Sequence, residues 1–165
     1  MPRSEATLNV LRTRQRVCDY CKLNIGTSDA GDVSMPNIVG TWRLVRGSAV
    51  DQDGNQLAPP YGGEQAMGRV TFNSDGRMMA VLCDGRPCLP PEEVREYTSY
   101  CGNYTFDGKR LITRVDAASD ADRMGTDQVR DVHFEGELMV LRPPVKAYGS
   151  TVQQRELAWE KIADV

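Results

Sequence analysis

The sequence predicts an all-β protein: an eight-stranded antiparallel up-and-down barrel with one short helix. From Asn37 onward, apolar and polar residues alternate in regularly spaced segments, which is typical of strands. Short glycine-containing turns separate these segments, among them "NSDGR" at 73–77 and "DGK" at 107–109. The 165 residues, 40% of them hydrophobic, suit one domain with its own core. An eight-stranded barrel has an interior wide enough for side chains or one small ligand.

The alternation places the strands in order along the chain. We expect them at 38–50, 67–72, 78–83, 100–106, 111–117, 126–134, 138–142 and about 152–162. The helix is expected within "LPPEEVREYTSY" at 89–100. Pro90 and Pro91 suit the first turn of a helix, and the acidic Glu92 and Glu93 suit its positive end.

Residues 1–34 differ from the rest and are predicted to be a helical or disordered N-terminal extension before a barrel domain at 35–165. Ser4 could cap a short helix with a thin apolar stripe. Met35 is an alternative start of the chain. Cys18 and Cys21 form a CxxC pair, but a zinc site needs about four ligands and no second pair follows. A poorly docked N-terminal extension is therefore favoured over a metal site.

Composition narrows the classes of function. The net charge is −3 and the pI is near 5.2, so neither nucleic acid nor acidic membranes are expected partners. There is no apolar run of membrane-spanning length and no secretory segment, so we expect the protein in the cytoplasm. In that compartment the five cysteines are expected to be reduced thiols. With one histidine and no nucleotide-binding, GxSxG, HExxH or EF-hand motif, we expect no metal and no cofactor. The oligomeric state, monomer or homodimer, stays open.

Several stretches together resemble the lipocalin-like domain family of small bacterial and fungal single-domain proteins. These are "IVGTWRLV" (38–45), "MGRVTFNSDGRMMAVL" (67–82), "YCGNYTFDGKRLITRVDAASDADRMGTDQVRDV" (100–132) and "RELAWEKI" (155–162). The "GTDQVR" block at 125–130 is the most specific of them. The resemblance covers about three quarters of the chain, from about Asn37 to Ile162, and leaves residues 1–34 outside it.

The resemblance implies a small barrel in which Trp42 closes one end. Gly40 would let the chain bend into the barrel floor, and a basic side chain of the last strand, with Arg155 the candidate, would lie across the Trp42 ring. The family often has a histidine before the arginine of the fifth strand, whereas this chain has Thr113 before Arg114. An activity that depends on that histidine is not expected here.

Strand alternation divides the candidate ligand-binding residues into faces. Arg114 shares a face with Asp116, and Arg130 shares one with Val132 and Phe134. A ligand pocket is mostly apolar with a few convergent polar groups, and an arginine inside it could hold a carboxylate or phenolate. The predicted ligand-binding residues are Arg114, Arg130, Met79, Tyr97 and Phe106. The plain alternative is that these charges face solvent.

The leading hypothesis is a binder of a small, largely apolar organic molecule with an acidic or phenolic group. The alternative is a cofactor-independent isomerase, cyclase or lyase acting in the barrel, with Asp116, Tyr100 or Tyr104 as the acid–base group. A third hypothesis gives residues 1–34 a role in protein interaction. His133, Cys83 and Cys101 are expected to have no catalytic role, since alternation places His133 on the polar face and each cysteine lies in a strand.

Overall fold

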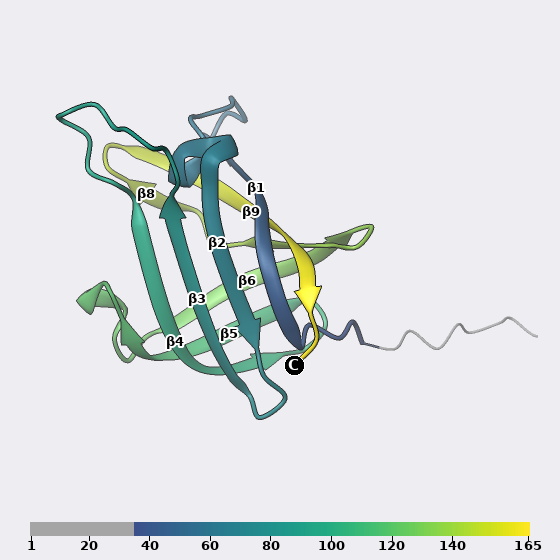
Figure 1. Cartoon of the computed structure of the whole chain (residues 1–165). Coiled ribbons are helices and arrows are strands. Elements are labelled where there is room, and N and C mark those ends of the chain that lie inside the picture. Colours follow the sequence, from purple (N-terminus) through teal and green to yellow (C-terminus); the bar gives the residue numbers. More distant parts are fainter. Residues whose placement is uncertain (1–34) are drawn as a thin grey trace, which may run out of the picture. The chain divides into compact units, whose positions relative to one another are not determined.

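The structure, a computed structural model, describes residues 35–165, which form a closed antiparallel β-barrel (Figure 1). Two short 3-10 segments accompany the strands, η1 (Pro60–Gln65) and η2 (Ala121–Arg123). The strands are β1 (Gly40–Val50), β2 (Ala66–Phe72), β3 (Arg77–Asp84), β4 (Tyr97–Phe106), β5 (Arg110–Ala118), β6 (Asp127–Glu135), β7 (Leu138–Arg142), β8 (Lys146–Tyr148) and β9 (Thr151–Ala163).

Eight of these strands make the barrel, as the sequence predicts. Each strand from β1 to β7 pairs antiparallel with the next, β7 pairs with β9, and β9 pairs with β1 to close the wall. The short β8 was not predicted; it pairs with β9 alone and forms a hairpin on it. The predicted up-and-down barrel is therefore confirmed.

The end of the barrel at the start of β1 is filled by side chains. Trp42 is buried there, and its indole N–H donates to the carbonyl of Ile38 at 2.9 Å. Gly40 has φ +138°, and a Cβ on it would lie 2.7 Å from the carbonyl oxygen of Ala163. Glycine is therefore required where β1 meets the last residues of β9.

The basic side chain beside Trp42 is Lys161, and the prediction of Arg155 there is wrong. The Lys161 Nζ lies 5.9 Å from the centroid of the Trp42 ring. Arg155 lies at the other end of β9, with its guanidinium 3.6 Å from the centroid of the Tyr148 ring. The register of β9 explains this difference, because Lys161 pairs directly with Trp42 across the closing seam whereas Arg155 pairs with Ala49.

The helix expected at 89–100 is not formed. A single turn links the carbonyl of Pro90 to the N–H of Glu93, the chain then runs without regular structure, and β4 begins at Tyr97. Contacts within the connecting segment take the place of a helix: Arg86 pairs with Glu93 at 2.6 Å, and the Arg95 guanidinium donates to the carbonyl of Arg86 at 2.8 Å.

The N-terminal expectations, including the capped helix after Ser4 and the Cys18–Cys21 pair, lie outside the described residues. Within residues 35–165, no helix has the length and apolar character needed to cross a membrane.

Candidate ligand-binding cavity

A cavity of about 260 Å³ occupies the barrel at the end away from Trp42. The strands place apolar side chains around it because every second residue of a strand points inward. β3 contributes Met78, Ala80 and Leu82 in this way, with their outward neighbours exposed or half-buried. The complete apolar wall consists of Val70, Met78, Ala80, Leu82, Leu111, Leu141, Leu157 and Trp159.

Trp159 is the polar exception in this apolar wall. The residue is 2% exposed, and its Nε1 is the one fully buried side-chain nitrogen or oxygen of the described residues that has no hydrogen-bond partner. A buried donor without a partner costs free energy, on the order of 1–3 kcal/mol. The Trp159 ring lines the cavity, but its Nε1 is itself fully buried.

Charged side chains surround the opening of the cavity. The cations are Arg123, Arg130, Lys146 and Arg155, and the anions are Glu96 and Asp120. Arg155 pairs with Glu96 at 2.7 Å, and Arg123 pairs with Asp120 at 3.7 Å. Arg130 instead donates to the carbonyl of Val129 at 2.6 Å and approaches the Gln128 side chain at 3.5 Å. The opening is therefore rich in donors.

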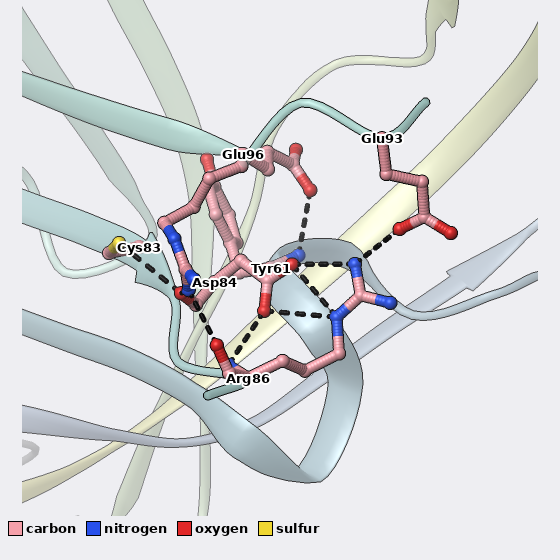
Figure 2. Close-up of polar contacts among 7 residues, drawn as sticks. Tyr61, Cys83, Asp84, Arg86, Glu93 and Glu96 are labelled. Carbon is pink, nitrogen blue, oxygen red and sulfur yellow. Dashed lines mark hydrogen bonds and ion pairs between the residues drawn. The ribbon is translucent and has the colours of Figure 1, made fainter. Parts of the chain in front are cut away.

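The η1 loop covers part of the opening with Tyr61. This residue has φ +57°, a left-handed conformation that is rare for a bulky side chain. Its N–H donates to Glu96 at 2.7 Å (Figure 2). Glu96 also accepts from Arg155. Its hydroxyl reaches Thr98 at 3.3 Å, and burial raises the pKa of the phenol. These contacts hold the Tyr61 ring in place over the apolar wall.

A buried carboxylate, Asp84, anchors this loop at the end of β3 (Figure 2). Its oxygens accept from the backbone N–H of Arg86 at 2.9 Å and from the guanidinium of Arg86 at 2.7 and 2.9 Å. These hydrogen bonds hold the pKa of the Asp84 carboxyl below its usual value. A Cβ on Gly62 would lie 2.8 Å from the Asp84 carboxyl carbon, so η1 packs directly on this ion pair.

The Asp84 pair predicts a specific dependence of stability on acid. The pKa of Asp84 is lower in the folded chain than in the unfolded chain. The Asp84 carboxylate therefore stabilises the fold above the unfolded-state pKa of about 4, and this stabilisation is lost as the pH falls through the folded-state pKa. We expect Asp84→Asn to lower the midpoint of thermal unfolding by several degrees at pH 7 and to flatten the decline below about pH 4.

Differential scanning calorimetry from neutral to acid pH tests this expectation. The control is Asp116→Asn, which removes a half-exposed carboxylate whose pKa is also lowered, by Arg77, and which should have the smaller effect. An Asp84→Asn protein as steeply acid-sensitive as the unmodified chain would contradict this account of Asp84.

The predicted ligand-binding residues divide between the cavity and the outer surface. Arg130 alone of the five lines the cavity. Phe106 is half-buried and packs against the core without lining the cavity. The other three point outward, contrary to the prediction: Arg114 is 64% exposed in its side chain and pairs with Asp127 at 3.3 Å, and Met79 and Tyr97 are 59% and 53% exposed.

The predicted acid–base residues are not brought together. Asp116 lies on the outer face, where it pairs with Arg77, so its expected place inside the barrel is wrong. Tyr104 is interior but distant from the opening; its hydroxyl donates to the carbonyl of Asn73 at 2.9 Å, and burial raises its pKa. Tyr100 lines the cavity, with the Arg123 guanidinium 5.4 Å from its ring centroid.

Alternation along β5 explains the outward position of Asp116, because Val115 is buried and Arg114 and Asp116 on either side of it are exposed. A β-bulge lies at the same place: Gly102 pairs with Val115 and Cys101 pairs with Ala117, which leaves Asp116 as the extra residue of β5. His133 is half-exposed beside Glu135 at 3.4 Å, in agreement with its predicted surface position.

Sequence reasoning missed several residues of the cavity opening. Tyr61 lies in "PPYGGEQ", where two prolines and two glycines indicated an unusual turn without indicating its contacts. Arg123, Lys146 and Tyr148 lie in segments that the sequence predicts to be connections between strands. The position of Trp159 could have been predicted from the sequence, because alternation places its side chain on the same face of β9 as that of Leu157.

Comparison with known families accords with this geometry. A family model described as a lipocalin-like domain matches residues 39–162, the whole barrel from β1 to the end of β9. The chain belongs to the lipocalin-like domain family. Comparisons with curated proteins and with solved structures gave no match. The family thus establishes the type of barrel, and the chemistry of this lipocalin-like cavity has to be argued from its own residues.

No metal centre is evident in the described residues, since no group of three or more His, Cys, Asp or Glu side chains there is arranged to hold an ion.

Proposed function

We propose that this lipocalin-like barrel binds a small, largely apolar organic molecule in the cavity between Trp159 and Tyr61. The observation that carries the proposal is the cavity itself: about 260 Å³, with an apolar wall and a few polar groups at its opening. This combination of an apolar interior and a small number of orienting polar groups is what ligand sites have in common. Membership of the lipocalin-like family supports it.

The cavity wall also suggests how the ligand is oriented. The apolar wall around Trp159 favours an apolar group in the buried part of the ligand. The cations at the opening favour an acidic or phenolic group at the other end. A cytoplasmic location for this binding stays a prediction.

Fluorescence titration with Prodan, a small neutral naphthyl ketone whose emission shifts to the blue in apolar surroundings, tests the proposal. We expect saturable binding of one Prodan per chain with a dissociation constant in the micromolar range. This corresponds to a binding free energy on the order of 0.3–0.5 kcal/mol for each non-hydrogen atom of the dye. Decanol and decanoate should displace the dye. If none of the three molecules binds saturably, the proposal is wrong.

The enzymatic alternative keeps one of its three proposed residues in the cavity. Tyr100 lines it, whereas Asp116 and Tyr104 do not. A cofactor-independent isomerase, cyclase or lyase would consume a cavity ligand in excess over protein, and a Tyr100→Phe variant should then stop turnover while ligand binding persists. Mass spectrometry of the free ligand pool distinguishes the two functions, because a binder leaves it unchanged.

A further inference from the structure

The wall of the barrel has an interruption beside the cavity, between β6 and β8. β6 pairs with β7 over Asp131–Glu135, and its earlier residues, 127–130, pair only with β5. β7 ends at Arg142, two prolines follow, and β8 then pairs only with β9. Figure 1 shows β8 extending away from the start of β6. Prolines lack the N–H that would continue a ladder, so Pro143 and Pro144 help keep this edge unpaired.

The interruption lies between the cavity and a groove on the outside of the barrel. The groove has a volume of about 220 Å³. Arg123, Arg130, Lys146 and Tyr148 line both the groove and the inner cavity, and Pro143 does so too. These side chains lie between the two spaces, at the interruption of the wall, and we call this interruption with its rim of side chains the side opening.

The cations of this rim include the two at the cavity opening that have no ion-pair partner. Arg155 and Arg123 are paired with Glu96 and Asp120. Among the described residues, Arg130 bonds only to the Val129 carbonyl and the Gln128 side chain, and Lys146 lies 5.5 Å from the Tyr148 ring centroid without an acidic partner. The acidic residue that lines the groove, Asp127, is itself paired with Arg114 at 3.3 Å.

We propose that the ligand is an anionic amphiphile held through this side opening, with its apolar part in the cavity and its anionic group between Arg130 and Lys146. The inference rests on the proposed function and specifies the ligand class and the place of its head group. A carboxylate at this point would supply the charge partner that both cations lack, between the half-buried Arg130 and the exposed Lys146. An apolar chain attached to it would reach the wall around Ala80 and Leu111.

Competition against bound Prodan by decanoate and by decanol tests the assignment, because the two chains differ in their head group alone. We expect Arg130→Gln and Lys146→Gln each to weaken decanoate about tenfold and to leave decanol within about twofold. The matched control is Arg114→Gln, an outward arginine of β5, which should change neither affinity.

Acetylation of the lysines provides a second readout of the head-group position. Saturating decanoate should slow acetylation of Lys146 in the unmodified chain, whereas decanol should not. Lys161, beside Trp42 at the other end of the barrel, is the internal reference and should react at the same rate in all samples.

The two proposals fail in different ways. Equal losses for decanoate and decanol in the Arg130→Gln and Lys146→Gln variants, or unchanged affinity for both, would overturn the side-opening assignment while Prodan binding still supports a cavity binder. Unprotected Lys146 at saturating decanoate would also overturn it. If Prodan, decanol and decanoate all fail to bind the unmodified chain, the proposed function itself is overturned.

Discussion

Gly102→Ala is expected to destabilise the barrel by about 3 kcal/mol, near the upper end of what added atoms cost in a packed interior. Gly102 is buried in β4 at the bulge with β5. A Cβ on it would meet the carbonyl oxygen of Arg114, lie 2.7 Å from the carbonyl carbon and lie 3.0 Å from the Cα of Val115. These are backbone atoms of the neighbouring strand, so no side-chain rotation can relieve the contact.

Urea unfolding of the variant measures this loss. The matched control is Gly54→Ala, because Gly54 has a positive φ but open space around its Cβ position. That substitution should cost about 1–2 kcal/mol, the price of the left-handed conformation without a steric clash. A Gly102→Ala protein as stable as the Gly54→Ala protein would show that β4 and β5 are not so closely apposed at the bulge.

Ala80→Leu is expected to weaken ligand binding at least tenfold, which corresponds to about 1.4 kcal/mol, while the fold remains intact. Ala80 is 2% exposed in the middle of β3, and its side chain lines the cavity. A leucine there occupies space that the ligand would take. Because the space is already present, the free energy of unfolding should stay the same or rise, as cavity-filling substitutions often increase stability.

The control for this variant is Ala117→Leu, the same change at an exposed position on the outside of β5. Prodan titration and thermal unfolding are measured for both proteins. Unaltered Prodan affinity in a folded Ala80→Leu protein would mean that the dye binds outside the barrel, and the cavity would lose its proposed role.

The strand order of the barrel could be predicted because strand identity is a local property. Period-two alternation and glycine turns mark each hairpin within a few residues, as at 73–77 between β2 and β3. The helix prediction at 89–100 failed because its signals, two prolines followed by two glutamates, do not require a helix. In the structure Glu93 pairs instead with Arg86, which in turn pairs with Asp84 at the end of β3.

The sequence predicts which residues share a face of a strand, but it does not predict which of the two faces points into the barrel. Alternation correctly grouped Arg114 with Asp116 and Arg130 with Val132, but it could not decide which group meets the core. That choice follows from pairing: Leu111 and Thr113 of β5 are buried, which turns Arg114 outward, and Arg130 faces Leu111 across the ladder. The side opening depends on the divergence of β6 from β8, which strand alternation alone does not predict.

Native mass spectrometry of the chain, after equilibration with a small-molecule extract of the cells that produce it, tests whether the ligand site lies inside the barrel. We expect one amphipathic acid to be retained unchanged in a one-to-one complex with the unmodified chain and with Ala117→Leu, and to be lost from Ala80→Leu. Retention that is equal on Ala80→Leu, or a spectrum in which the unmodified chain retains nothing, would contradict a ligand site inside the barrel.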